Sequence, residues 1–129
     1  MGATVRQRAW RALASIEELD EGASIFSGDE NDRAYFVNGR QVANTTPETI
    51  ELRLTRKAIS AHRSKLRDDP RVILRGSSDW IGVQPRRVVD IDLVVELAVL
   101  TVEANRPPPG ATRKLPPSGP ELERRRKSH

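Results

Sequence analysis

The amino-acid sequence predicts an α+β fold, in which an antiparallel sheet of four to six strands has helices packed on one face. Three observations support this class. Apolar residues recur at helical spacing towards both ends of residues 1–105, strand-like alternation fills the middle, and the pair Asn38-Gly39 separates two strand-like arms. Strands joined by hairpins and short connections form antiparallel sheets, and helices can cover one face of such a sheet.

The 129-residue chain has the length of one domain followed by a tail. Residues 106–129 contain six of the nine prolines and few large apolar side chains, so we expect this tail to be disordered. The tail has seven basic and two acidic residues, a net charge of +5, whereas residues 1–105 have a net charge of −1. The high isoelectric point is therefore a property of the tail.

The composition excludes several classes of protein. Cysteine is absent, which excludes disulfides and thiolate metal sites. The N-terminus lacks the apolar stretch of a signal peptide, and the longest apolar segment, 91–102, is shorter than the about 20 residues that span a bilayer. We expect a cytoplasmic protein that has no membrane partner.

The first helix is predicted over residues 4–19, with Thr4 as its N-cap. Acidic residues at its C-terminal end oppose the helix dipole, so we expect this end to fray. A short strand over 23–27 and an exposed acidic loop over 28–32 follow. The segment "RAYFVNGRQVAN" then forms a hairpin, because the Asn-Gly pair tolerates the positive φ angles of a type I′ turn.

The middle of the chain predicts a strand and a second helix. The segment "TIELRL" (49–54) alternates apolar and charged residues, which is typical of a strand covered on one side only. Thr55 can cap a helix over 56–67, in which His62 shares the apolar face. This helix ends before Pro70, because the residue that precedes a proline avoids the α region.

Two short strands, 71–75 and 79–83, are predicted on either side of a Gly-Ser-Ser turn. Trp80 and Gly82 point to one face of the second strand and Ile81 to the other. Trp80 either closes the core at the end of the sheet or lies on the opposite face as a contact surface. We favour the core position, because tryptophans of small domains are mostly buried.

The last helix is predicted from Asp92, or one turn earlier, to about residue 105. Its apolar arc is wide, because Val95, Val99 and Val102 lie outside the main stripe. Either other parts of the fold pack against this helix on two sides, or the valines form a surface for a protein partner or a homodimer.

Residues suited to catalysis are few. His62 and His129 are the only histidines, and a structural role is the simpler interpretation of His62. The motifs of zinc proteases, serine hydrolases and nucleotide-binding loops are missing. The acidic residues Asp29, Glu30 and Asp32 are spaced like the start of a calcium loop but lack its glycine and its final glutamate. We predict no catalytic residue, no metal site and no cofactor.

Basic residues concentrate between residues 53 and 75 and in the tail, which is typical of phosphate binding. The alternative is a solvated helix face. The candidate contacts to nucleic acid are Arg56, Lys57, Arg63, Lys65, Arg67, Arg124, Arg125 and Arg126.

These observations favour a non-enzymatic binding or interaction module. Its candidate ligand contacts lie on the sheet and are Arg40, Asn44, Arg53 and Trp80. Nucleic-acid binding through the basic helix and the tail is one alternative. A small enzyme with a site near the hairpin is another, and it would need a closed pocket that holds a strongly perturbed ionisable group.

The segments "YFVNGRQVA", "IELRLTRKAI", "DPRVILRGSSDWIGV" and "VVELAVLTVEA" together resemble the small bacterial domains called luciferase-like (DUF5519). Their order is more loosely similar to the MmcQ/YjbR family, and this similarity implies a CyaY-like fold with a double-wing DNA-binding motif. Asn44 and Thr46 stand where luciferase-like members often carry a His-x-His pair. The resemblance therefore implies no chemistry that uses this pair.

Overall fold

A computed structural model describes residues 3–25 and 32–106 of the chain. Its elements in chain order are α1 (Val5–Ala12), a 3-10 turn η1 (Leu13–Ser15), β1 (Asp20–Ala23), β2 (Arg33–Val37), β3 (Arg40–Thr45), β4 (Ile50–Arg53), α2 (Arg56–Ala61), α3 (Arg63–Asp68), β5 (Val72–Leu74), β6 (Trp80–Val83) and α4 (Asp90–Ala104).

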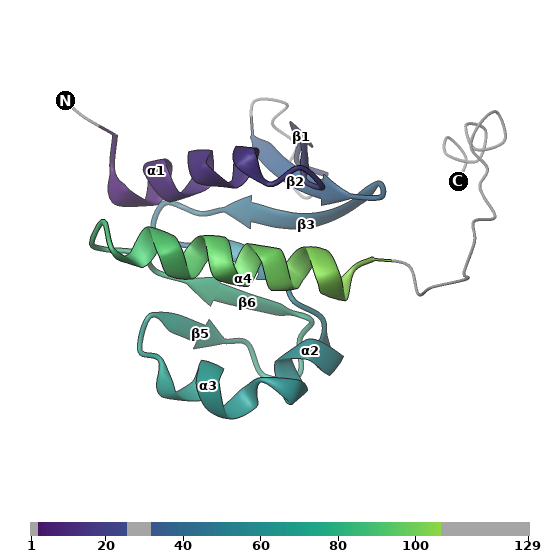
Figure 1. Cartoon of the computed structure of the whole chain (residues 1–129), viewed down its shortest axis with the longest axis vertical. Helices are drawn as coiled ribbons and strands as arrows, with labels where there is room; N and C mark the ends of the chain where they lie inside the picture. Colours follow the sequence, from purple (N-terminus) through teal and green to yellow (C-terminus); the bar gives the residue numbers. More distant parts are fainter. Residues whose placement is uncertain (1–2, 26–31, 107–129) are drawn as a thin grey trace, which may run out of the picture.

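The strands form one sheet in the order β1-β2-β3-β4-β6-β5, and every neighbouring pair is antiparallel. Helices α1 and α4 lie side by side on one face, and α2 and α3 lie beside the edge strand β5 (Figure 1). The predicted α+β class, with an antiparallel sheet and helices on one face, is confirmed. The six strands are the upper end of the predicted number.

The predicted hairpin is confirmed at the turn between β2 and β3. Asn38 and Gly39 have φ angles of 51° and 80°, the left-handed values that a type I′ turn needs. The pairing of Val37 with Arg40 closes the turn. A shift of register after Tyr35 marks a β-bulge further along the same pair of strands.

The N-terminal helix is shorter than predicted. Thr4 forms a capping box with Gln7, as the N-cap prediction requires. After Ala12 the helix tightens into the 3-10 turn, and Ile16 is already extended. The following strand, β1, pairs with β2 and ends at Ala23 opposite the first residue of β2, so the strand predicted over 23–27 is misplaced. Pairing with β2, the next strand in the chain, sets the limits of β1.

The single helix predicted over 56–67 is two helices. Thr55 caps the first by accepting a hydrogen bond from the backbone of Ala58. His62 leaves helical geometry, with φ −113°, although backbone hydrogen bonds continue on both sides of it. The kink allows Ile59 and Leu66, one from each helix, to join the same core. The second helix ends before Pro70, as predicted.

The core lies between the sheet and the layer formed by α1 and α4. Alternate residues of β4 are buried, Leu52 among them, as is Ile81 of β6, and α4 packs against β4. The wide apolar arc of α4 has two neighbours, the sheet beneath it and α1 beside it. Val102 is therefore buried and Val95 is half-buried, whereas Val99 is 42% exposed on the outer side of α4.

Arg106 is the last described residue, and its guanidinium pairs with Glu18 at 3.0 Å. The rest of the predicted tail, 107–129, lies outside the described residues, as does all of the predicted acidic loop except Asp32.

Candidate binding site on the open sheet face

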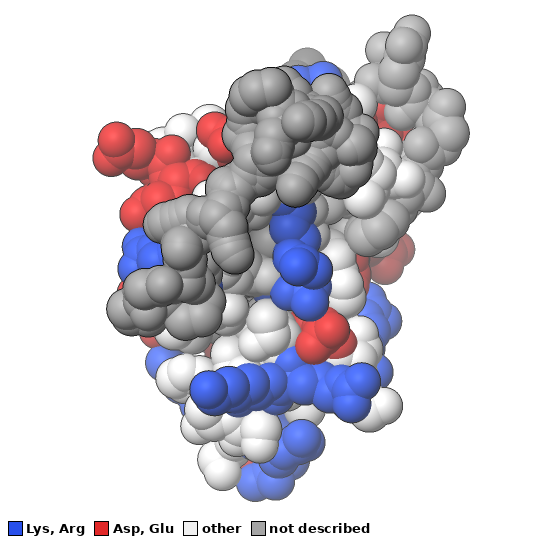
Figure 2. All heavy atoms as spheres, turned by 90° about the vertical axis from the view of Figure 1, so that its right-hand side faces the viewer, with Lys and Arg blue, Asp and Glu red and all other residues white. Residues whose placement is uncertain are grey.

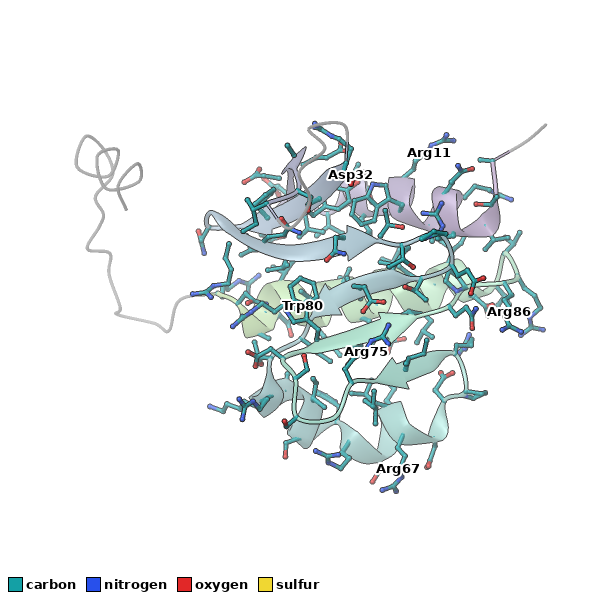
Figure 3. The ribbon with its side chains drawn as sticks, turned by 180° about the vertical axis from the view of Figure 1, so that it is seen from behind. Arg11, Asp32, Arg67, Arg75, Trp80 and Arg86 are labelled. Atoms are coloured by element: carbon teal, nitrogen blue, oxygen red, sulfur yellow. The ribbon has the colours of Figure 1, made fainter. Side chains whose placement is uncertain are left out.

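The sheet face opposite α1 and α4 is not covered by any described helix, and we call it the open face (Figure 3). Because Ile81 of β6 is buried towards the helices, its neighbours Trp80 and Gly82 point to the open face. Strand pairing places Arg53 of β4 opposite Trp80, and Glu51 opposite Gly82. Charged side chains of β4 therefore lie beside an indole ring on this face.

The expectation that Trp80 belongs to the core is wrong. Trp80 is half-buried, lies outside the buried core cluster and projects from the open face (Figure 3). The alternation of β6 gives its core positions to Ile81 and Val83, which leaves Trp80 on the other side. Among the residues that the structure describes, the buried aromatic side chain is that of Tyr35, whose ring centroid lies 4.6 Å from that of Trp10.

Two arginine–carboxylate pairs lie next to Trp80. The guanidinium of Arg53 lies 3.5 Å from the carboxylate of Asp79. On the other side, Arg75 donates to both oxygens of Glu51, at 2.7 and 3.3 Å. The second pair is the tighter one, because two parallel hydrogen bonds hold it.

Arg53 is fixed in place by the end of α4. Its guanidinium donates to the side-chain oxygen of Asn105, and the amide of Asn105 donates to the backbone oxygen of Arg53 at 2.8 Å. The same amide also donates to the backbone oxygen of Thr101. Asn105, the C-cap of α4, therefore holds Arg53 at the end of the sheet nearest Trp80.

Two hollows meet at Trp80. The larger, of about 480 Å³, lies between the hairpin turn and the end of β4, and is lined by Ile25, Asn38, Gly39, Arg40, Gln41, Arg53 and Trp80. The smaller, of about 320 Å³, is lined by Asn44, Glu51, Arg75, Ser78 and Trp80. Arg40 is exposed and makes no ion pair or side-chain hydrogen bond with another described residue.

The structure brings the four predicted ligand contacts together around one side chain. Arg40 and Arg53 line the larger hollow, Asn44 lines the smaller one, and Trp80 lines both. The sequence reasoning missed four neighbours of this group: Glu51, Arg75, Asp79 and Asn105. The alternation of "TIELRL" could have identified Glu51, which shares a face with Arg53, but nothing local connects Asn105 with a strand 52 residues earlier.

The predicted basic helix divides into two parts. Arg56 and Lys57 are exposed at the start of α2, and the backbone of Arg56 donates to Asp79 at 2.8 Å, which places them near Trp80. Basic side chains gather at this end of the molecule (Figure 2). Lys65 instead pairs with Glu96 on α4, and Arg67 with the neighbouring Asp68.

Arg63 is exposed on α3, the helix that follows the kink. The tail candidates Arg124, Arg125 and Arg126 lie outside the described residues. Of the eight predicted contacts to nucleic acid, Arg56 is therefore the one that a hydrogen bond connects with the open face through Asp79, and Lys57 is its exposed neighbour on α2.

The groups with shifted pKa values lie away from both hollows. Burial, and secondarily Glu21, raises the pKa of Tyr35 to about 12. Hydrogen bonds from the backbones of Arg86 and Arg87 lower the pKa of Asp90 to about 2. These shifts have local structural causes, so they do not supply the perturbed group beside the hairpin that an enzyme site would need.

Other predicted features add nothing to the open face. His62 is half-buried at the kink between α2 and α3 and lines neither hollow. Within residues 3–25 and 32–106, no group of three His, Asp or Glu side chains is arranged to hold a metal ion. No helix in the same ranges has the length and apolar character needed to cross a membrane.

No family model, curated protein or solved structure matches the chain in comparisons with known proteins. The resemblance to the luciferase-like and MmcQ/YjbR families therefore stays a prediction.

Proposed function

We propose that this protein is a non-enzymatic binding module whose open face takes a ligand that combines a flat aromatic group with a negative charge. Nucleotides, free or within a single strand, have this chemistry. The observation that carries the proposal is the position of Trp80, which lies between two hollows and beside arginines from two strands and a turn.

An indole ring on an uncovered sheet is a platform on which a base can stack. Stacking of a base on an aromatic side chain contributes about 1 to 3 kcal/mol, and it tolerates any base. Antiparallel sheets that present aromatic side chains use this contact to hold unpaired bases. Trp80 has the position that such a contact needs, because it projects from the open face and Arg53 lies opposite it on β4 (Figure 3).

The larger hollow supplies the positive charge. Arg40 has no partner among the described residues, and Arg53 is held by Asn105 while its carboxylate partner, Asp79, lies at 3.5 Å. An arginine offers five donors and can bind two phosphate oxygens at once. Arg53 is already oriented, so binding an anion there costs little side-chain entropy.

A single-stranded nucleic acid is a longer ligand with the same chemistry. Arg56 and Lys57 lie beyond Asp79, where a phosphate next to a base on Trp80 can reach them. The resemblance to the MmcQ/YjbR family that the sequence suggests implies nucleic-acid binding of this general kind. A cytoplasmic location belongs to the same proposal, since it would give access to both nucleotides and nucleic acid.

Fluorescence of a Trp10→Phe variant tests the proposal, because Trp80 is then the only tryptophan. We titrate it with adenosine monophosphate and with an oligoadenylate of about ten nucleotides. Stacking on Trp80 is expected to quench its emission. The oligoadenylate should bind more tightly than the mononucleotide. Its affinity should also fall more steeply with added salt, because the protein contacts more of its phosphates.

Two variants separate the open face from non-specific attraction. Arg40→Gln should weaken the binding of both ligands. Arg63→Gln removes an equal charge from α3 and should leave mononucleotide binding unchanged. If neither ligand quenches Trp80 at low salt, the proposal is wrong. Equal losses for the two variants would mean that net charge alone attracts the ligand.

A further inference from the structure

The layer formed by α1 and α4 has a second surface, on the side of the molecule away from Trp80 (Figure 1). Four aliphatic residues line one side of α4 and of the turn that precedes it. They are spaced three or four residues apart: Val88, Ile91, Val95 and Val99. Val88 is 55% exposed and Val99 42% exposed, and the two between them are half-buried. We call these residues the aliphatic stripe.

An acidic ridge borders the stripe on one side. Asp92, Glu96 and Glu103 are exposed and share the outward face of α4 with Val99. The ridge lies towards α3, because Lys65 of that helix binds Glu96 at 2.9 Å. Asp92 and Glu103 make no ion pair with a described residue.

A basic ridge borders the stripe on the other side, and it belongs to α1. Trp10 turns towards Tyr35 of the sheet, so the opposite flank of α1 packs beside α4. Arg8 and Arg11, three residues apart, are exposed on the outer surface of α1. Neither guanidinium makes an ion pair or a hydrogen bond with another described residue.

Across the helix layer the surface therefore changes from basic to aliphatic to acidic. Such a surface is complementary to its own copy after a half-turn about an axis that runs along the helices. The rotation places the basic ridge of each copy on the acidic ridge of the other and brings the two stripes together. Twofold interfaces of this isologous kind are the commonest way in which identical chains associate.

We propose that the chain forms a homodimer through this surface, with the aliphatic stripes in contact and Arg8 and Arg11 of each copy facing Asp92 of the other. The charges select a second copy over other proteins, because both ridges are satisfied at once. Helix α4 has 15 residues, about 22 Å in length, and it provides most of the length of this surface.

Sedimentation velocity of the full chain over a range of concentrations tests the proposal. The chain should dimerise, and Val99→Asp should weaken the dimer by at least about tenfold because it buries a charge in the stripe. Ile25→Asp is the matched control: Ile25 is an aliphatic residue 69% exposed beside the open face, and its replacement should leave the dimer unchanged. Circular dichroism confirms that both variants are folded.

A charge exchange tests the twofold arrangement itself. One variant carries Arg8→Glu and Arg11→Glu, the other Asp92→Lys. Each alone should be monomeric, and an equal mixture should form a heterodimer, since both contacts are then again between opposite charges. A monomeric wild-type chain, a dimer that Val99→Asp does not weaken, or a mixture that stays monomeric would each overturn the proposal.

Discussion

The guanidinium of Arg75 meets the carboxylate of Glu51 directly over Gly82 on the open face. A Cβ atom at residue 82 would lie 2.8 Å from Nη2 of Arg75 and 2.9 Å from Oε2 of Glu51. The missing side chain therefore makes room for the ion pair. Glu51 is further held by the hydroxyl of Thr49 at 2.6 Å.

Gly82→Ala should separate this ion pair without unfolding the sheet. The displaced atoms are the ends of two side chains, and a partly exposed pair contributes little, so the free energy of unfolding should change by no more than about 1 kcal/mol. Urea unfolding measures this change, and the NMR signal of the Arg75 Nε–H should move. A loss of about 3 kcal/mol or more would mean that the strand itself cannot accept a methyl group.

Trp80→Ala should affect stability much less than loss of a core aromatic residue. Trp80 is half-buried outside the core cluster, so we expect a loss of about 1 kcal/mol. Tyr35→Ala, at a position 2% exposed, should cost about 3 to 5 kcal/mol. If both variants lost the same free energy of unfolding in urea, Trp80 would have to belong to the core.

The carboxylate of Asp90 should make the free energy of unfolding depend on pH in the acid range. It accepts hydrogen bonds from the backbones of Arg86 and Arg87 at 2.9 Å and from Arg71 at 3.0 Å, and its pKa in the folded protein is about 2. This pKa lies below the ordinary value of about 3.9. The stabilisation is therefore complete above about pH 4 and disappears as the pH falls towards 2.

Asp90→Asn should flatten that part of the pH profile. Because the amide cannot match the charge of the carboxylate, the variant should also be less stable at pH 7, by about 2 to 4 kcal/mol. Asp69, whose pKa Arg71 also lowers, should contribute acid dependence in both proteins, and its pKa should be lower still in the variant because the charge of Asp90, which raises it, is removed. Identical profiles for the two proteins would show that Asp90 does not control the acid response.

Gly39→Ala tests the hairpin turn. Nothing lies within 4 Å of the position of a Cβ atom at Gly39, so the cost of this change is conformational: its φ of 80° is unfavourable for alanine. We expect a loss of about 1 to 2 kcal/mol. Asn38→Gly, at the neighbouring position with φ 51°, should have little effect. A neutral Gly39→Ala variant would exclude a tight left-handed turn in solution.

Local chemistry explains which elements could be predicted. The Asn-Gly turn, the Thr4 and Thr55 caps and the stop before Pro70 each depend on residues within a few positions of one another, and all four are confirmed. The limits of β1 depend on its pairing with β2, and the kink at His62 depends on the packing of Ile59 and Leu66 in the core. Neither feature follows from the local sequence.

The candidate site shows the same division. Alternation placed Arg53 and Trp80 on defined faces of their strands, but it did not say which face the helices cover. The burial of Ile81 in the core cluster decides this point, and it places Trp80 on the open face. Asn105 and Arg75 reach the site only through the tertiary structure, from a helix end and a turn.

The most direct test of the open-face site is a two-dimensional NMR spectrum of the two indole N–H groups. Trp10→Phe assigns them, since one signal disappears. On addition of adenosine monophosphate, the signal of Trp80 should shift progressively while that of Trp10, on the helix side of the sheet, stays in place. A shift confined to Trp10, or no shift of either signal, would contradict a ligand site on the open face.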